Sequence, residues 1–253
     1  MSEPQLKVLA IGATGSVGRH VIGEALHHGH RVRALVRSRA KVHFPTEVGV
    51  VVGDLTHLGS LSSAADRVDA IVFTHGSHGG ATAAQAVDYG GVRNVLAALG
   101  GHQPRIALMT AIGVTDRKEA HDWKRRAERL VRASGLPYTI VRPGWFDYND
   151  PDQLRLVLRQ GDKRQSGTPR DGVVARHQLA EVLVNSLTSD EALRKTFELV
   201  AETGPATRDF NRLFDTVDAD VIGAVDGLHD AANMPLDQEP PEVLKELDSV
   251  RAC

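Results

Sequence analysis

Short apolar runs, separated by segments of helical length, recur along the first two thirds of the chain. They lie at residues 8–11, 32–36, 48–52, 70–73, 105–109 and 138–141. The runs are nearly continuous rather than alternating, which is typical of parallel strands buried on both faces. The segments between them predict helices after Gly18 and at residues 58–65, 83–99 and 123–133. This alternation predicts an α/β fold with a parallel sheet covered by helices on both faces.

The regular alternation ends near residue 147. Residues 147–175 are rich in turn signals, with a short strand or hairpin expected around 154–158. A helix over 178–187, a strand over 196–200 and helical patches at 209–217 and 242–250 follow. We interpret residues 1–253 as a single domain in which 147–175 and 205–253 are insertions that form a small C-terminal lobe on the substrate side.

A glycine-rich turn joins the first predicted strand to the first predicted helix. Residues 12–18 read GATGSVG, and a second apolar run follows the helix. In this setting Gly12 permits a tight turn, Gly15 lets the backbone approach a pyrophosphate, and Gly18 lets the helix pack closely. The N–H groups at the helix start favour a bound phosphate. The pattern predicts a doubly wound, Rossmann-type domain with cofactor contacts at Gly12, Thr14, Gly15, Ser16, Val17 and Gly18.

The end of the second strand bears on the choice of cofactor. NAD-binding folds place an acidic residue there to bind the ribose 2′-hydroxyl, whereas an arginine accommodates the 2′-phosphate of NADP. Here the strand ends at Val36 and Arg37, with no acidic residue. The guanidinium of Arg37 suits a phosphate, and Arg19 could reach the same group. We therefore expect NADP(H), the alternative being that these arginines are solvated surface cations.

Composition excludes several classes of function. The 253 residues carry 30 basic and 32 acidic side chains, a net charge of −2, so we expect no nucleic-acid or membrane partner. The single cysteine, Cys253, argues against a disulfide framework, and we expect no metal site. No apolar run approaches the roughly 20 residues of a membrane span, and the start of the chain lacks a signal-peptide core. We expect a cytoplasmic protein.

Several motifs, in a fixed order along the chain, resemble one family. They are the turn at 12–18, Gly53-Asp54-Leu55, the stretch 89–94 (YGGVRN), Lys124, the stretch 133–144 (ASGLPYTIVRPG) and 173–180 (VVARHQLA). Together they resemble an atypical short-chain dehydrogenase/reductase of the NmrA-like, NAD(P)H-binding group, in the neighbourhood of the flavin and biliverdin-IXβ reductases. The resemblance covers about residues 6 to 200.

The resemblance implies further contacts with the cofactor. It would place Asp54 and Leu55 at the adenine ring and Thr74, His75 and Gly76 along the ribose and pyrophosphate. By the same resemblance, Pro143, Gly144, Trp145 and Phe146 would lie near the nicotinamide, with Lys124 at the ribose.

The catalytic pattern of the superfamily is incomplete here. Relatives usually place a tyrosine four residues before the lysine, but position 120 is alanine while Lys124 is present. Thr110 is the hydroxyl left where a serine usually stands. His121, three residues before Lys124, shares its helix face and is one candidate proton donor, unless it is an exposed histidine near a helix start. The alternatives are Tyr148, unless it is an ordinary loop aromatic, and His75 or His78 in the loop after the fourth strand. We expect the other basic residues of 124–132 to form a mostly solvated helix face.

Three functions remain open. The first is an NADP(H)-dependent oxidoreductase that acts on a small carbonyl, quinone or flavin-like acceptor, since such acceptors can take a hydride without a strong protein acid. The second is a non-catalytic, NmrA-like NADP sensor that binds a partner protein. The third is a nucleotide-sugar epimerase or dehydratase. A homo-oligomer, or a protein partner bound through the C-terminal segment, fits each of them.

Overall fold

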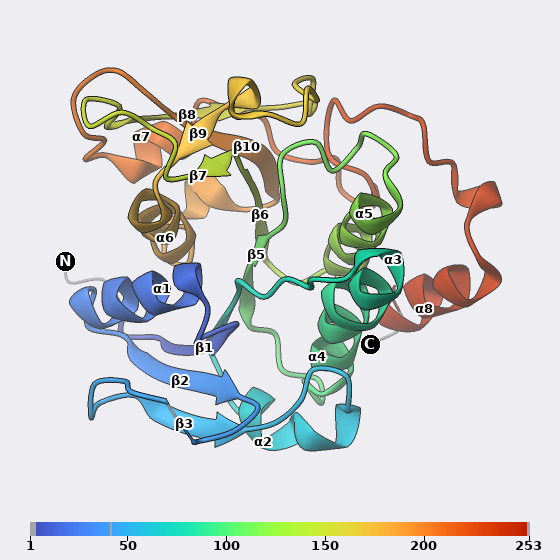
Figure 1. Cartoon of the computed structure of the whole chain (residues 1–253). Coiled ribbons are helices and arrows are strands. Elements are labelled where there is room, and N and C mark those ends of the chain that lie inside the picture. The colour runs from blue at the N-terminus through green and yellow to red at the C-terminus, as the bar shows by residue number, and fades with distance from the viewer. Residues whose placement is uncertain (1–3, 41, 252–253) are drawn as a thin grey trace.

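An eight-stranded sheet forms the centre of the computed structural model, which describes residues 4–40 and 42–251, so that Cys253 lies outside the described residues (Figure 1). The strand order is β3-β2-β1-β4-β5-β6-β10-β8. All neighbours are parallel except β8, which runs antiparallel to β10 at the edge. The strands are β1 (Lys7–Ile11), β2 (Arg31–Val36), β3 (Gly49–Val52), β4 (Ala70–Phe73), β5 (Arg105–Met109), β6 (Tyr138–Pro143), β8 (Arg155–Arg159) and β10 (Lys195–Glu202). The predicted doubly wound, Rossmann-type sheet is confirmed.

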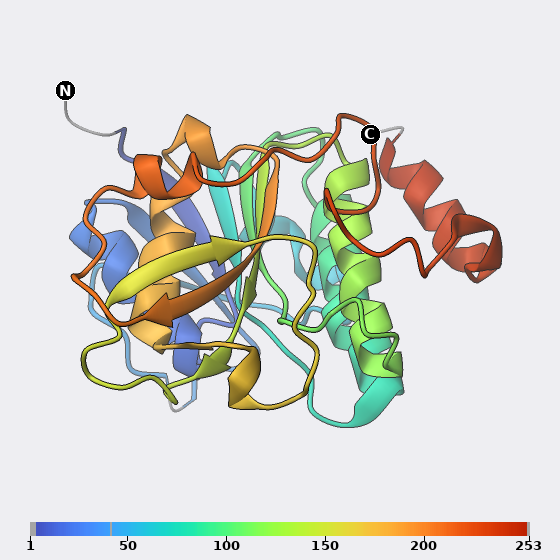
Figure 2. The ribbon, with the colours of Figure 1, turned by 90° about the horizontal axis from the view of Figure 1, so that it is seen from above.

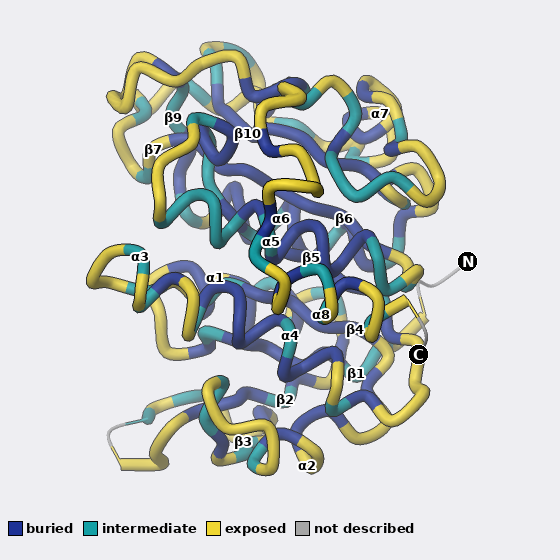
Figure 3. Tube along the Cα trace, turned by 90° about the vertical axis from the view of Figure 1, so that its right-hand side faces the viewer, coloured by how far each residue is buried: buried dark blue, intermediate teal, exposed yellow. Residues whose placement is uncertain are grey.

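Helices cover both faces of this sheet (Figure 1). On one face lie α1 (Ser16–His27) and α6 (Arg176–Asn185), whose apolar side chains share one core cluster. On the other lie α4 (Gly90–Ala97) and α5 (Glu119–Ala133), in a second cluster. Shorter helices are α2 (Ser62–Ala65), α3 (Gly80–Ala83) and α7 (Phe210–Phe214). Strands β1, β4, β5 and β6 run through the buried centre between the two layers (Figure 3).

The chain order creates a crevice between β1 and β4. From β1 the connections lead outward to β2 and β3, whereas from β4 they lead the other way to β5 and β6. The loops after β1 and β4 therefore diverge at the carboxyl end of the sheet. In open α/β sheets, ligands bind at this point.

Two predicted helices are interrupted. Residues 58–65 form a 3₁₀ turn (Leu58–Ser60) followed by α2. Residues 80–97 contain α3, a π-helical stretch (Ala84–Tyr89) and then α4. A π turn widens the helix by one residue, and such turns are frequent at functional sites. The carboxylate of Asp88, inside this stretch, is buried and bonded to the loop after β4.

The expectation of a solvated basic face on α5 is wrong. Arg125, Arg129 and Arg132 are buried, because residues 218–240 run along the outer side of α5 and cover them (Figure 2). This segment supplies the matching carboxylates Asp220, Asp226 and Glu239, and its Asp230 pairs with Arg142 of β6. Helix α8 (Pro241–Arg251) then packs beside α5 and buries Val243 and Leu247.

The remaining segments extend the carboxyl side of β6. Strand β7 (Trp145–Phe146) pairs in parallel with β9 (Val173–Val174), and the chain between them forms β8 and a 3₁₀ turn (Pro169–Asp171). The final 3₁₀ turns are Asp190–Ala192 and Leu236–Gln238. Among the described residues, no helix combines the length and apolarity needed to cross a membrane.

Candidate functional site

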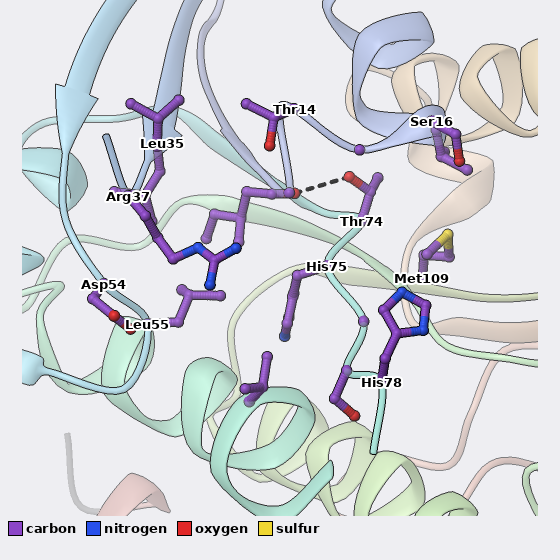
Figure 4. A pocket seen from close by; sticks show the side chains of 18 of the residues that line it. Thr14, Ser16, Leu35, Arg37, Asp54, Leu55, Thr74, His75, His78 and Met109 are labelled. Atoms are coloured by element: carbon purple, nitrogen blue, oxygen red, sulfur yellow. Dashed lines mark hydrogen bonds between the residues drawn. The ribbon is translucent and has the colours of Figure 1, made fainter. Parts of the chain in front are cut away.

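A cavity of about 660 Å³ opens where the loops after β1 and β4 diverge (Figure 4). Its walls come from the glycine turn, the ends of β2 and β3, the loop after β4, the end of β5 and β7. Of the predicted cofactor residues, it brings together Gly12, Thr14, Gly15, Ser16, Val17, Arg37, Asp54, Leu55, Thr74, His75, Gly76 and Phe146. Gly18, Lys124, Pro143, Gly144 and Trp145 do not line it.

Close backbone approach explains the glycines of the turn. Gly12 has φ +79°, and a Cβ there would lie 2.6 Å from the backbone nitrogen of His75. A Cβ on Gly18 would lie 2.2 Å from the carbonyl oxygen of Gly12. Side chains at either position would therefore push the turn away from β4 or lift α1 from the turn. Gly15 is less restricted, with 3.1 Å to the oxygen of Gly12.

The start of α1 suits an anion. Gly15 precedes the helix in an extended conformation, no side chain caps the helix, and its first turn carries no acidic residue. Ser16 and Val17, the first residues of α1, line the cavity. Helix N-termini attract negative charge, so a pyrophosphate fits against this turn.

Arg37 lies at the opposite end of the cavity, beside Asp54 and Leu55 (Figure 4). Its exposed guanidinium makes no hydrogen bond or ion pair with the described residues. Asp54 is fixed by Thr56, whose backbone N–H and hydroxyl both donate to Oδ1 at 2.8 Å. These bonds, together with the nearby charges of His57 and Arg37, lower the pKa of Asp54. A cation without a bonded partner at this position fits a phosphate group on the adenosine ribose.

The loop after β4 contributes an unpaired histidine. Thr74 donates its hydroxyl to the carbonyl of Ile11 at 2.9 Å and so joins the two loops (Figure 4). His75 lies against Phe73 and Gly91, and neither of its ring nitrogens has a hydrogen-bond partner. Burial, with the charge of Lys124, lowers its pKa to about 4, although Asp88 opposes the shift. His75 is therefore a neutral ring that lines the cavity, with both of its nitrogens buried and Nε2 facing Gly91.

Lys124 belongs to a hydrogen-bonded group beneath this loop, centred on the buried carboxylate of Asp88. Its Nζ donates to Oδ1 of Asp88 at 2.8 Å, and the backbone N–H of Ser77 donates to the same oxygen at 3.2 Å. The Ser77 hydroxyl bonds to the other carboxylate oxygen. Gly76 and Ser77 line the cavity, so the group reaches it through them. Sequence reasoning missed Asp88, whose only signal is an acidic residue just before the YGG stretch.

The other two catalytic candidates lie elsewhere. Thr110 is buried and donates to Oε1 of Glu128 at 2.7 Å. The Nδ1 atom of His121 lies 2.8 Å from the carbonyl of Gly113 and 3.0 Å from Asp116. Neither side chain lines the cavity. Burial alone would raise the pKa of Glu128, but Arg142 and Arg132 lower it to about 2, so Thr110 has an ionised acceptor.

The backbone of residues 143–146 lies close to that of Gly172. A Cβ on Gly144 would lie 2.5 Å from the carbonyl of Gly172, and Trp145 donates its N–H to the same oxygen at 2.9 Å. Phe146 then lines the cavity, while Trp145 turns outward against Tyr148. Met109 and His78, also cavity residues, lie together at this end (Figure 4). Within the described residues, no group of three or more His, Cys, Asp or Glu could hold a metal.

Comparison with known proteins agrees with this geometry. A sequence model described as NAD(P)H-binding matches residues 12–190. The chain belongs to this NAD(P)H-binding family. It is an atypical, NmrA-like short-chain dehydrogenase/reductase, as the motifs predicted.

Two relatives illustrate the breadth of the family. The UPF0659 protein YMR090W of Saccharomyces cerevisiae is 32% identical over 220 residues, which cover 79% of this chain and 95% of the yeast protein. Sanguinarine reductase of Eschscholzia californica is 39% identical over 98 residues, covering 38% of this chain and 35% of that enzyme.

Solved structures share the fold. A Bacillus halodurans protein described as an NAD-dependent epimerase/dehydratase superposes with a TM-score of 0.69 at 24% identity, covering 84% of this chain and 100% of that chain. A short-chain dehydrogenase/reductase of Veillonella parvula, solved in complex with NADP, has a TM-score of 0.59 at 16% identity over 78% of this chain and 95% of that chain.

Proposed function

We propose that the protein is an NADPH-dependent reductase whose acceptor is a quinone, a flavin-like molecule or another conjugated carbonyl. The observation that carries the choice of cofactor is Arg37, a cation without a bonded partner directly after β2, where NAD-binding folds place an acidic residue. The carboxylate of Asp54 lies in the loop after β3. Its Oδ1 accepts hydrogen bonds from the backbone N–H and the hydroxyl of Thr56.

The chain's residues divide the binding work along the cavity. Arg37 and Leu55 hold the adenosine end, the start of α1 holds the pyrophosphate, and Met109, His78 and Phe146 border the opposite end. NADPH supplies the hydride when bound. The protein orients the reacting groups and excludes water, and the apolar surfaces of Met109 and Phe146 suit both tasks.

The choice of acceptor follows from the missing tyrosine. Ala120 stands where relatives carry a tyrosine, and His121 and Thr110 are both bonded outside the cavity. Conjugated acceptors spread the charge of the incoming hydride and need no strong protein acid. The name of one relative, sanguinarine reductase, supports a reductase within this family.

The test is to mix the protein with NADPH and follow loss of the nicotinamide absorbance with a panel of quinones, free flavins and aldehydes. The proposal predicts loss with at least one quinone or flavin and slower loss with simple aldehydes. Tight NADPH binding without turnover across the panel would favour the NADP sensor instead. Turnover of aldehydes alone would contradict the assignment of the acceptor.

A further inference from the structure

Arg176, the first residue of α6, reaches across to the glycine turn. Its Nε donates to the hydroxyl of Ser16 at 2.9 Å, although 160 residues separate the two in sequence. Its guanidinium also lies over the ring of Phe146, 4.9 Å from the centroid. Ser16 and Phe146 both line the cavity, so the cation is at its rim, next to the start of α1.

A single carboxylate balances this cation. Asp147 forms an ion pair with the Arg176 guanidinium, and its Oδ1 also accepts the backbone N–H of Arg176 at 3.0 Å. Burial alone would raise the pKa of Asp147, but the bonds from Arg176 and the charges of Arg176 and His20 lower it. Asp147 has φ +58° and donates its N–H to Val174, so its backbone is held in an uncommon conformation beside α6.

The first turns of the two helices beside this pair add no negative charge. Neither α1 nor α6 has an acidic residue in its first turn, and Asp147 is the carboxylate that contacts Arg176. The pair is partly open to solvent, with 31% of the Arg176 side chain and 49% of the Asp147 side chain exposed. Partial exposure leaves the guanidinium room to change partners without disturbing the buried core.

We propose that Arg176 binds a pyrophosphate oxygen of the dinucleotide and that Asp147 competes with that phosphate for the guanidinium. The assignment rests on the dinucleotide site proposed above. A guanidinium 2.9 Å from Ser16 lies beside the helix start against which a pyrophosphate fits, and phosphate oxygens are strong acceptors for its planar donors. Asp147 sets the affinity, because the ion pair must be exchanged for the phosphate bond.

Calorimetric titration of NADPH and NADH into four variants tests this role. R176Q should weaken both dinucleotides by the same factor, about tenfold to a hundredfold, which is typical for loss of a hydrogen bond to a charged group. Their ratio should not change, because Arg176 faces the pyrophosphate that both share. R155Q, which breaks a surface ion pair with Glu202 at the sheet edge, is the matched control and should bind as the wild type does.

Asp147→Asn separates binding from structure. Asparagine keeps the Oδ1 acceptor for the backbone N–H of Arg176 but loses the charge, so D147N should bind both dinucleotides about threefold or more tightly. In the R176Q background the same substitution should lose that gain. D147N stands as a test even if R176Q does not fold.

Three results would overturn the role of Arg176. These are wild-type affinity in R176Q, a loss confined to NADPH, which would place Arg176 at the 2′-phosphate, and weaker binding in D147N, which would make the pair a structural tie. Absence of binding in the wild type would instead remove the dinucleotide site itself.

Discussion

The Nζ atom of Lys124 lies 2.8 Å from Oδ1 of Asp88, beneath the loop that lines the cavity. Asp88 is almost fully buried and also fixes Ser77. The family's lysine therefore has a carboxylate partner from the π-helical stretch, and no tyrosine stands at position 120. A largely buried amine needs such a partner, so Asp88 holds Lys124 in place.

We predict that Asp88→Asn lowers turnover of the best acceptor about tenfold to a hundredfold, because Lys124 and Ser77 lose the group that positions them. NADPH affinity should change less than about threefold, since the start of α1 and Arg37 are untouched. Asp116→Asn is the matched control, an acidic residue that pairs with Lys118 away from the cavity. Steady-state kinetics and calorimetry separate the two effects, and equal turnover in both variants would contradict the role of Asp88.

Arg37→Ala should separate the two dinucleotides. Losing a guanidinium bonded to the 2′-phosphate weakens NADPH about tenfold to a hundredfold. NADH, which lacks that phosphate, should lose less than about threefold. Calorimetry with both dinucleotides gives the ratio directly, and equal losses would remove Arg37 from the phosphate site.

Gly18→Ala and Gly23→Ala test the packing of α1. A Cβ on Gly18 meets the oxygen of Gly12 at 2.2 Å, so the substitution should destabilise the fold by about 1–3 kcal/mol and weaken NADPH binding. Gly23 lies in the same helix with no atom within 4 Å of a Cβ, and alanine there should stabilise by roughly 0.5–1 kcal/mol. Urea unfolding measures both changes. A neutral Gly18→Ala would mean that α1 does not need this close approach.

Glu198 predicts a pH dependence of stability. Burial raises its pKa to about 7, assisted by Asp162 and Asp230, while Arg142 opposes the shift. The folded state therefore holds a proton that the unfolded chain releases above its ordinary value of 4.5. This contribution to stability is present below about pH 4.5 and is lost as the pH rises through 7.

Glu198→Gln removes that proton exchange. Between pH 5 and pH 8 the variant should gain stability relative to the wild type, by on the order of 2–3 kcal/mol in unfolding free energy. The difference between their melting temperatures should therefore shift in favour of the variant as the pH rises. Melting curves at several pH values measure it. A difference that stays constant across this range would contradict a raised pKa.

His121→Ala should leave turnover within about twofold of the wild type, because the ring is bonded to Gly113 and Asp116 and lines no part of the cavity. Its cost should appear in stability, at about 1 kcal/mol for the lost hydrogen bonds. A turnover loss above tenfold with unchanged NADPH affinity would restore His121 as the proton donor.

The individual strands, turns and helices could be predicted from the sequence, because neighbouring residues specify each of them. The glycine turn and the strand that ends at Arg37 are examples. Asp88 and Arg176 were not predicted as site residues, since their partners Lys124 and Ser16 are distant in the chain. Their side chains meet these partners only once the sheet has assembled.

The basic face of α5 is a second case in which contacts with a distant segment could not be predicted from the sequence. Arg125, Arg129 and Arg132 have the helical pattern of a solvated face. They are buried because residues 218–240 form a further layer over α5. The residue pattern within α5 cannot predict its contact with a segment that follows some 90 residues later in the chain. In that setting each guanidinium has its carboxylate, so the helix tolerates buried charge.

The most direct test of the central claim is a calorimetric titration of the wild-type protein with NADPH and with NADH. If the cavity between the loops after β1 and β4 is an NADP(H) site read by Arg37, NADPH binds once per chain and about tenfold or more tightly than NADH. Equal affinity for the two, or binding of neither, would contradict it.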